Sequence, residues 1–420
     1  MEKYPTYKQS GIKWISEIPE HWETLRAKNM FTKEKRSIRE EDDVITCFRD
    51  GQVTLRKNRR TTGFTESITE VGYQGIRKGD LVIHQMDAFA GAIGVSDSDG
   101  KGTSVYHCCT PKGKYDATYF AYLIRIMAYS GYIQSLYRGI RERSSDFNFN
   151  IFGRQYLAVP PYFEQQSIVT FLENETANID AYIKQRQQEI IALNELKQAE
   201  IAQVVTKGLN PNAPMKDSGI AWIGEIPEHW ECKRIGSTYI ENKHINSDLG
   251  CNEAYKFNYG SLVRKDEDVK LEEVADVYSK YTVISKNDII INGLNLNYDF
   301  VTQRVAIVEQ KGIITSAYVA ITPRDEVNSE YFSYLFKSMD AKKLFNGMGT
   351  GIRLTLGFGE LKKQQIPIPP KDEQDLIVKN IKAKTSKIEE YIAALKSEIA
   401  QMQEYKQRLI SDVVTGKMKV

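Results

Sequence analysis

The side chains best suited to binding chemistry in this chain are basic residues gathered in short segments. The densest run is Arg56-Lys57-Asn58-Arg59-Arg60. Arginine and lysine donate hydrogen bonds to guanine O6 and N7 or to phosphate oxygens, and asparagine can hydrogen-bond adenine. We therefore interpret this run as a DNA contact. The alternative is a solvated loop.

A second group of arginines follows later in each half of the sequence. Arg138, Arg141 and Arg143 lie in the first half, and the Gly-Ile-Arg triplet that ends at Arg141 recurs at Arg353. Glycine beside an arginine lets the backbone approach a duplex closely. We expect these arginines to contact DNA, although they could instead pair with carboxylates.

Weaker candidates come from polar residues near predicted strands and in the second half of the chain. Gln85 and Asn292 each follow a strand and could present an amide to a base edge, or could be ordinary loop residues. Lys243, Arg264 and Lys265 are further candidate DNA contacts.

Composition limits the class of protein. The 420 residues carry 57 basic and 55 acidic side chains, so a DNA-binding protein of this charge must concentrate its basic residues locally. The length exceeds that of one hydrophobic core, so we expect several domains. No apolar run approaches the ~18 residues of a membrane span. The five cysteines lack paired spacing, which indicates reduced thiols in a cytoplasmic protein with no metal site.

The sequence contains an internal duplication. Residues Ser10–Glu23 recur as Ser218–Glu231, 208 positions later, and only two of the 14 positions differ. Residues Tyr119–Leu123 match Tyr331–Leu335 at a spacing of 212. Such self-similarity indicates one structural unit written twice, with short insertions inside the copies.

Each copy closes with a heptad pattern that predicts a long helix, which continues for about 30 residues past Thr176 or Thr385, ~45 Å at 1.5 Å per residue. Its apolar stripe needs a partner, and the simplest partner is the other copy. Basic residues Arg186, Lys197 and Lys406 interrupt the seam, which favours a bundle completed by helices of another subunit. The apolar residues predicted to form the core or to dock a partner are Ile179, Ile183, Ile190, Leu193, Ile388, Ile392, Leu395 and Ile399.

The chain order predicts that the two helices are antiparallel. The first helix leads directly into the second domain, where the second helix begins, and domain termini are usually close together. We expect an α+β fold: two duplicated α/β domains separated by two long antiparallel coiled-coil helices in a circular arrangement with pseudo-two-fold symmetry. The expected boundaries are domain one 1–159, helix one 160–207, linker 208–216, domain two 217–367 and helix two 368–420.

Within the domains, periodicity predicts both strands and helices. Strands are predicted at Asp80–Ile83 and Ser104–Cys108 and, in the second copy, at Asp288–Ile291 and Ala317–Ile321, and helices at Tyr119–Tyr137 and Glu330–Phe345.

One sequence feature resembles a catalytic motif but lacks the required chemistry. Val159-Pro160-Pro161-Tyr162 is similar to an amino-methyltransferase motif, but valine cannot accept a hydrogen bond from the target amine. We interpret the prolines as helix-start signals. The tryptophans of the repeated segment are better explained by packing at the junction of domain and helix than by catalysis. No catalytic residue is therefore predicted.

The paired Ile-Pro-Glu-His-Trp segments and the helix starts Val-Pro-Pro-Tyr-Phe-Glu-Gln and Ile-Pro-Pro-Lys-Asp-Glu-Gln resemble type I restriction–modification specificity subunits over the whole chain. The resemblance implies two target-recognition domains that each read one half of a split, asymmetric site in double-stranded DNA. It also implies spacer helices that set the gap and dock two methyltransferase subunits, with restriction subunits joining them. S-adenosylmethionine and ATP would bind only to these partners. Less favoured alternatives are a self-sufficient adenine methyltransferase and a helical adaptor that binds only proteins.

Overall fold

The computed structural model describes residues 2–59, 72–136, 146–265, 271–297, 303–324 and 327–420. The chain divides into two compact units. Unit 1 comprises Met1–Arg186 with Ser397–Val420, and unit 2 comprises Gln187–Lys396. Each unit holds one α/β domain and a segment of each long helix, α5 (Tyr162–Lys207) and α10 (Lys371–Val414). The unit boundary thus falls inside both helices.

The domain of unit 1 is built on an antiparallel four-stranded sheet. Its strand order is β4 (Phe31–Lys33), β11 (Tyr106–Pro111), β8 (Leu81–His84) and β9 (Ile93–Val95). Helix α2 (Ala117–Tyr129) packs on this sheet through a continuous apolar core. The smaller elements are β1 (Tyr7–Ile12), β2 (Ile15–Pro19), β3 (Glu23–Arg26), β5 (Ile45–Cys47), β6 (Val53–Leu55), β7 (Gln74–Ile76), β10 (Gly100–Gly102), β12 (Tyr156–Val159), α1 (Ala27–Met30), α3 (Tyr132–Ser135), α4 (Phe149–Arg154), η1 (Arg56–Asn58) and η2 (Ala88–Ala90).

The domain of unit 2 repeats this plan. Its four-stranded sheet has the order β16 (Tyr239–Glu241), β23 (Val319–Pro323), β20 (Ile289–Ile291) and β21 (Val305–Ile307), with α8 (Ser329–Ala341) packed on it. The other elements are β13 (Met215–Ile220), β14 (Gly224–Pro227), β15 (Glu231–Arg234), β17 (Tyr255–Asn258), β18 (Ser261–Arg264), β19 (Thr282–Ile284), β22 (Gly312–Ile314), β24 (Gln365–Ile368), α6 (Ile235–Thr238), α7 (Leu271–Tyr278), α9 (Phe358–Leu361) and η3 (Phe345–Gly347). The predicted duplication and α+β class are confirmed.

The predicted strands all form, but both predicted domain helices end early. Helix α2 stops at Tyr129 and not at Tyr137, because Gly131 adopts φ +76°, a left-handed conformation that interrupts the helix. Helix α8 stops at Ala341 and not at Phe345, and Lys343 nearby has φ +57°. A single left-handed residue breaks the helical hydrogen-bond ladder without changing the apolar periodicity that predicted the longer helices.

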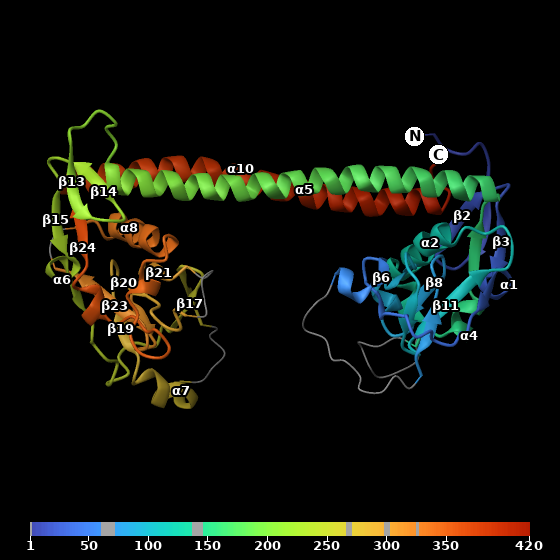
Figure 1. The fold of residues 1–420 in the computed structure, drawn as a ribbon, viewed down its shortest axis with the longest axis horizontal. Helices are drawn as coiled ribbons and strands as arrows, with labels where there is room; N and C mark the ends of the chain where they lie inside the picture. Colours follow the sequence, from blue (N-terminus) through green and yellow to red (C-terminus); the bar gives the residue numbers. More distant parts are fainter. Residues whose placement is uncertain (1, 60–71, 137–145, 266–270, 298–302, 325–326) are drawn as a thin grey trace. The chain divides into compact units, whose positions relative to one another are not determined.

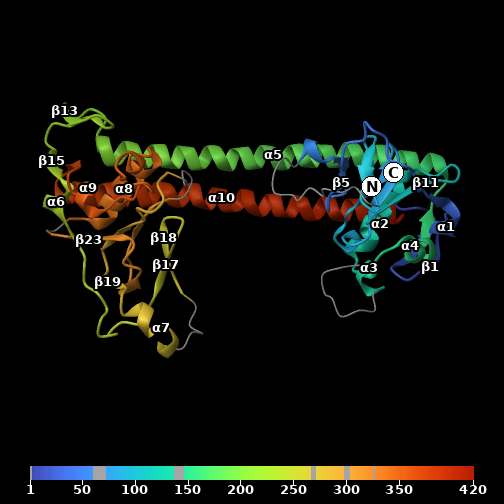
Figure 2. The same ribbon diagram turned by 60° about the horizontal axis from the view of Figure 1, so that its bottom comes forward.

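Within each unit, α5 and α10 run antiparallel, as predicted, and lie alongside one another (Figures 1 and 2). The residue numbers of the paired side chains rise along α5 as they fall along α10. The ion pairs are Asp180–Lys406 (2.7 Å) and Arg186–Glu398 (3.6 Å) in unit 1, and Lys197–Glu389 (3.1 Å) and Glu200–Lys384 (2.8 Å) in unit 2.

The three basic seam residues therefore have carboxylate partners inside this chain. Their presence gives no independent reason for a larger helix bundle, contrary to the sequence interpretation. Exposed pairs of this kind contribute only about 0–1 kcal/mol each, so the apolar seam provides most of the stability of the helix pair.

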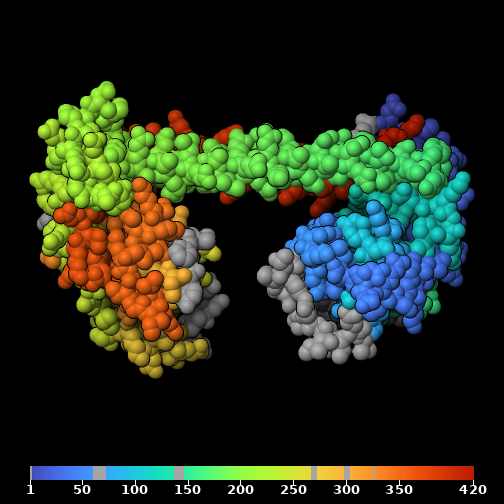
Figure 3. All heavy atoms as spheres, viewed as in Figure 1, coloured from blue at the N-terminus to red at the C-terminus, as the bar shows by residue number. Residues whose placement is uncertain are grey.

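The apolar residues predicted for the seam or for partner docking separate into two groups by burial. Ile179, Ile183, Ile392 and Leu395 are buried within the units. The half-buried residues are Ile190, Leu193, Ile388 and Ile399. The first group packs inside the chain. Docking of a partner by the predicted residues therefore stays a prediction, and it depends mainly on the second group. In the space-filling view, atoms of α5 form part of the molecular surface along the helix (Figure 3).

In unit 1 the repeated Ile-Pro-Glu-His-Trp segment packs against the start of α5. The Trp22 indole is fully buried and its Nε1 donates to Glu164 Oε1 at 3.2 Å. His21 Nε2 lies 2.9 Å from the other oxygen of Glu164, and the Tyr4 hydroxyl donates to Oε1. Glu164 stands in the first turn of α5, where a negative charge interacts favourably with the helix dipole. The predicted packing role of this tryptophan is confirmed.

Unit 2 contains the same junction at the start of α10. Trp230 Nε1 donates to Glu373 Oε2 at 3.0 Å, and His229 Nε2 lies 2.8 Å from the same atom. In both units a buried tyrosine of the domain helix then holds the end of the other long helix. The two hydrogen bonds are Tyr119 Oη to Val414 O (2.9 Å) in unit 1 and Tyr331 Oη to Val205 O (2.7 Å) in unit 2. The C-terminal segment thus returns to the N-terminal domain, as predicted.

All five cysteines are free thiols, as predicted, and Cys47, Cys108 and Cys109 are buried. Burial raises the pKa of Cys108 to about 12, so this thiol stays protonated at neutral pH. In the described part of the chain, no helix is long and apolar enough to span a membrane.

Candidate nucleic-acid interface

The basic run of unit 1 forms a one-turn helix, η1 (Arg56–Asn58), on the surface after β6. Lys57 Nζ pairs with Asp43 at 2.6 Å, and Asn58 Nδ2 donates to Thr54 Oγ1 at 2.8 Å. Arg56 is half-buried. Arg60 lies outside the described residues.

Arg59 has the most constrained side chain of this run. Its guanidinium pairs with Asp50 at 2.7 Å, donates to Gln52 Oε1 at 3.0 Å, and lies 4.2 Å from the Phe48 ring centroid. These contacts hold the group in place, but they also compensate its charge. A phosphate would therefore have to compete with Asp50 for Arg59.

Sequence reasoning missed two arginines in the same part of unit 1. Arg49 pairs with Asp87 at 2.9 Å, which ties the turn after β5 to the loop after β8. Arg125, from α2, donates to the Tyr129 hydroxyl at 3.0 Å. Neither lies in a basic run. Arg49 directly precedes Asp50, the partner of Arg59, and the Arg125 guanidinium lies beside Gly51, so the fold brings both arginines near Arg59.

Gln85 lies in the loop after β8, as predicted, and is half-buried. Its Nε2 donates to Asp146, and its backbone N–H donates to Val105 O at 2.8 Å. These bonds fix the loop to a neighbouring segment. Arg138, Arg141 and Arg143 lie outside the described residues, so their predicted DNA contacts stay predictions.

In unit 2 the three weaker basic candidates all have partners. Lys243 pairs with Glu241 at 2.9 Å, and Arg264 pairs with Glu253 at 2.6 Å. Lys265 donates to the Tyr281 hydroxyl at 3.0 Å and lies over the same ring. Lys243 and Arg264 are exposed, so both could exchange these partners for phosphate at little cost.

The loop after β20 in unit 2 is held by hydrogen bonds from a buried arginine. Arg304 is 1% exposed, and its guanidinium donates to Asn292 O at 3.0 Å and to Leu294 O at 2.8 Å. Its backbone N–H donates to Asp340 Oδ2 of α8 at 2.7 Å. The amide oxygen of the candidate Asn292 accepts from Leu294 N at 3.2 Å, so this side chain shapes the turn.

Arg353 lies on a short hairpin that packs against this loop. Thr350 and Thr355 exchange two backbone hydrogen bonds of 3.1 and 2.9 Å, which close the hairpin around Gly351-Ile352-Arg353. Gly351 adopts φ +75°, a conformation suited to glycine.

Two further contacts anchor the base of the hairpin to the loop after β20. Leu356 N donates to Gly293 O at 2.9 Å, and Leu296 N donates to Leu354 O at 3.2 Å. A Cβ atom at Gly293 would lie 2.2 Å from Leu356 O, so only glycine permits this approach. The hairpin is thus held in place at the surface by backbone hydrogen bonds to this loop.

The Arg353 side chain is exposed and, among the described residues, has no ion pair or hydrogen-bond partner. It differs in this respect from the other described basic candidates, which are paired or have further contacts. A guanidinium without an internal acceptor is available to an external one, such as a phosphate or the edge of a guanine.

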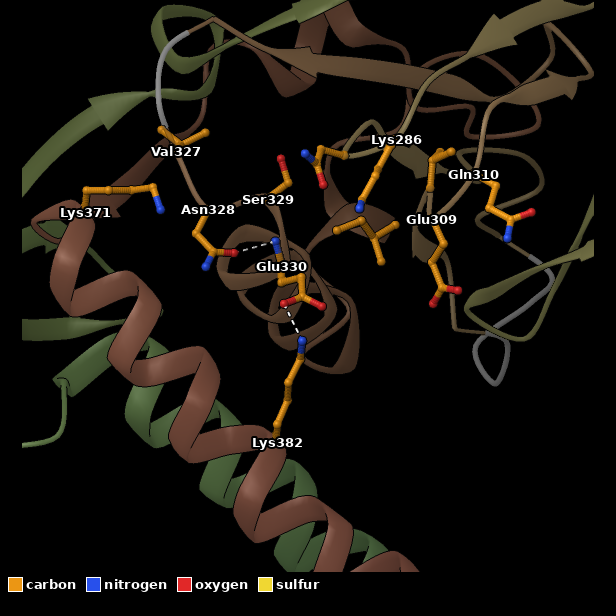
Figure 4. A pocket seen from close by; sticks show the side chains of 12 residues that line it. Lys286, Glu309, Gln310, Val327, Asn328, Ser329, Glu330, Lys371 and Lys382 are labelled. Atoms are coloured by element: carbon orange, nitrogen blue, oxygen red, sulfur yellow. Dashed lines mark hydrogen bonds and ion pairs between the residues drawn. The ribbon is translucent and has the colours of Figure 1, made fainter.

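A polar cavity of about 630 Å³ lies elsewhere in unit 2, where α8 begins beside α10 (Figure 4). The Lys382 ammonium pairs with Glu330 at 2.6 Å across it, and Asn328 Oδ1 accepts from the Glu330 backbone N–H. Lys371, at its rim, pairs with Asp375 at 2.6 Å. Three of the charged side chains that line this cavity, Glu330, Lys371 and Lys382, are thus paired within the chain. In the described part of the molecule, no cluster of histidine, cysteine or carboxylate side chains could hold a metal ion.

Sequence reasoning also missed Glu164 and Glu373. Both stand three residues after a Pro-Pro pair, so the signal was present in the repeat. Their function became clear only when the fold placed the buried Trp22 and Trp230 indoles beside them.

Comparison with known proteins agrees with this architecture. Residues 227–401 match the model of the family described as type I restriction modification DNA specificity domain. A putative type I restriction enzyme MjaX specificity subunit from Methanocaldococcus jannaschii is 24% identical over 459 aligned positions, covering 99% of this chain and 98% of that protein.

Solved structures show the same fold. A chain from a structure described as the basis of complex assembly and conformational transition of the type I R-M system matches with TM-score 0.67 and 15% identity, covering 96% of this chain and 99% of that one. The HsdS subunit from Thermoanaerobacter tengcongensis matches with TM-score 0.51 and 15% identity over 96% and 98% of the two chains.

The duplicated domains, the paired helices and these matches define a subunit of the DNA-specificity class. The resemblance inferred from the sequence is confirmed: residues 227–401 match the family of the type I restriction modification DNA specificity domain, and the chain as a whole is similar to a type I specificity subunit.

Proposed function

We propose that this chain is the non-catalytic subunit that selects the DNA sequence for a type I restriction–modification complex. Each domain reads one half of a bipartite, asymmetric site. The helices α5 and α10 set the distance between the half-sites and dock two methyltransferase subunits, which restriction subunits join. S-adenosylmethionine and ATP bind to those partners and not to this chain.

The observation that carries the proposal is that one framework is built twice with different loops. The tryptophan–glutamate junction and the tyrosine bond to a helix end recur in both units. The loops that follow the equivalent strands β8 and β20 differ, because Gln85 of unit 1 corresponds to Gly293 of unit 2. Similar frameworks with unlike loops support two readers of different half-sites.

The basic residues that support DNA binding come from these loops and hairpins. Arg59 and Arg353 are the strongest described candidates, one in each unit. Phosphate contacts fix the register of a protein on DNA, whereas contacts to base edges provide its specificity. We assign Arg353 to the second group, because hydrogen bonds hold the backbone of its hairpin and its guanidinium has no partner among the described residues.

A domain exchange tests the proposal. The segment Thr24–Val159 is replaced by the corresponding segment of another family member, and adenine methylation is mapped by single-molecule sequencing in cells that also express the methyltransferase and restriction subunits. We expect only one half of the recognised sequence to change. The matched control replaces Cys232–Ile368, which should change only the other half.

Other outcomes contradict the proposal. A change in both halves, or in neither, after the first exchange would exclude modular reading. Binding of S-adenosylmethionine by the isolated chain would favour a self-sufficient methyltransferase. A complete assembly that binds no duplex at low salt would favour a protein-only adaptor.

A further inference from the structure

The tip of the hairpin in unit 2 presents an aliphatic side chain to solvent. Ile352 is 98% exposed, the highest value among the large apolar side chains that the structure describes as exposed. Single exposed apolar residues are common on protein surfaces. Exposure alone therefore assigns no function to Ile352, and the argument depends on how the side chain is held and what lies beside it.

The hairpin holds Ile352 in a fixed position. The two backbone bonds between Thr350 and Thr355 close the loop, and Asn297 Nδ2 donates to the Ile352 carbonyl oxygen at 3.4 Å. At Gly349, a Cβ atom would lie 2.9 Å from Leu296 Cδ1, so the chain packs tightly at the base of the hairpin. A braced tip loses little conformational entropy when it binds a ligand.

The side chain beside Ile352 indicates the ligand. Arg353 is exposed and has no partner among the described residues, so the tip combines one cation with one aliphatic group. Duplex DNA offers both complements. Phosphates and guanine edges accept hydrogen bonds from arginine, and the 5-methyl group of thymine is the apolar group that base pairs display in the major groove.

We propose that Ile352 is a specificity-determining residue that contacts the 5-methyl group of a thymine in the half-site read by unit 2. The proposal depends on the DNA-reading function proposed above. Arg353 anchors the hairpin at the duplex, and Ile352 distinguishes thymine from the bases that lack this methyl group. Burial of one methyl group is worth about 0.8 kcal/mol, which is about fourfold in Kd.

The experiment uses the complex with its methyltransferase subunits and the target duplex identified by methylation mapping. Each thymine of the target is replaced in turn by deoxyuridine, which removes only the 5-methyl group. Kd is measured for the wild type and for Ile352→Ala. We expect one thymine at which deoxyuridine weakens wild-type binding about fourfold and has no further effect on Ile352→Ala.

Two controls separate reading from folding and from general affinity. Val277→Ala removes another exposed aliphatic side chain of unit 2, 50% exposed on α7, and should leave every Kd unchanged. A random duplex should bind the wild type and Ile352→Ala equally. Thermal unfolding of both variants should match that of the wild type, because neither side chain is buried.

Each remaining outcome has a defined meaning. If Ile352→Ala binds every duplex like the wild type, weakens target and random duplex equally, or weakens target binding with no deoxyuridine-sensitive thymine, the assignment of Ile352 is wrong. If it impairs only assembly with the methyltransferase, the tip is a protein contact and the assignment is also wrong. Failure of the wild-type complex to prefer the target over random duplex would instead reject the proposed function itself.

Discussion

The two domains share one fold but differ in the side chains that pack between the domain helix and the sheet. In unit 2 the strand β21 is preceded by Arg304, whose backbone and guanidinium connect Asp340 of α8 to the loop after β20. The equivalent positions in unit 1, before β9 and in α2, are Ala92 and Ala128, and both are buried. A polar pair in one copy thus corresponds to two small apolar residues in the other.

This difference shows how one framework can carry unlike loops. The buried arginine serves as a scaffold for a loop with a glycine at its centre, Gly293, against which the hairpin of Arg353 packs. In unit 1 the corresponding loop is held through Gln85 and Asp146 at the surface, so no buried charge is needed. Changes at a pair of core positions therefore accompany a change in the adjacent surface loop.

The largest expected effect comes from breaking the buried pair of unit 2. Arg304→Ala should destabilise unit 2 by about 3–5 kcal/mol, because a large buried side chain is lost and the carbonyls of Asn292 and Leu294 lose their charged donor. Asp340→Ala should cost about 1–3 kcal/mol, because it leaves the buried Arg304 backbone N–H without its acceptor. The double variant copies the alanines of unit 1 and should cost less than the sum of the two single changes. Hydrogen exchange of α8 and β21 measures the effect, with α2 and β9 as internal controls. Additive single effects would show that the two residues act independently.

The tryptophan–glutamate junctions allow a second comparison, because unit 1 uses one more donor. The Glu164 side chain is 10% exposed and faces Trp22, His21 and Tyr4, whereas Glu373 is 23% exposed and faces Trp230 and His229. We expect Glu164→Ala to destabilise unit 1 by about 2–3 kcal/mol and Glu373→Ala to destabilise unit 2 by about 1–2 kcal/mol.

Chemical unfolding followed by tryptophan fluorescence measures both variants. Glu173→Ala, an exposed position on the same helix α5, is the matched control and should have little effect. Equal losses in the two units would show that the Tyr4 hydroxyl contributes nothing to the junction.

A third difference lies in the central strands β11 and β23, where His107 of unit 1 corresponds to Val319 of unit 2. His107 is 3% exposed, and neither ring nitrogen has a hydrogen-bond partner among the described residues. Burial lowers the pKa of His107 to about 4. Since a histidine in the unfolded chain has a pKa of about 6.5, His107 binds a proton more tightly in the unfolded state than in the folded state.

The stability of unit 1 should therefore be complete above pH 6.5 and decline as the pH falls toward 4. The expected loss is about 2 kcal/mol between pH 7 and pH 5. His107→Val copies unit 2 and should remove most of this loss, as measured by hydrogen exchange of β11 at both pH values, with β23 as the internal control. A loss that persists in the variant would assign the pH dependence to other groups.

Sequence reasoning recovered the framework better than the site. The duplication, the long helices and the four central strands follow from repeats and periodicity, which depend on local side-chain order. The early end of α2 depends on the backbone conformation of Gly131, which leaves the apolar pattern unchanged. The Arg304–Asp340 contact joins residues 36 positions apart, so it required the fold.

For the candidate site, the sequence identified the basic residues but not which of them are free. The sequence gives both Arg59 and Arg353 as candidate arginines, and no pattern in it shows that one is paired and the other is not. Whether a guanidinium has a carboxylate partner depends on residues such as Asp50 that reach it through a turn. The exposure of Ile352 is likewise invisible in the sequence, where an isoleucine predicts burial.

The smallest expected effect is the difference in DNA affinity between variants of these two arginines. Arg353→Ala should weaken target binding about fivefold more than Arg59→Ala, a difference of about 1 kcal/mol. The reason is that Arg59 must leave Asp50 before it can bind DNA, whereas Arg353 leaves no described partner. Titrations of the complex with target and random duplex at several salt concentrations measure both variants.

The salt dependence then assigns each arginine to its contact. Loss of a phosphate contact reduces the slope of log K against log salt concentration by about 0.9 and affects all sequences equally, whereas loss of a base contact mainly affects the target. Asp50→Asn should release Arg59 and strengthen binding in the wild-type background but not with Arg59→Ala. If Asp50→Asn strengthened binding in both backgrounds, the aspartate would act only by repelling DNA, and the pairing with Arg59 would have no influence on recognition.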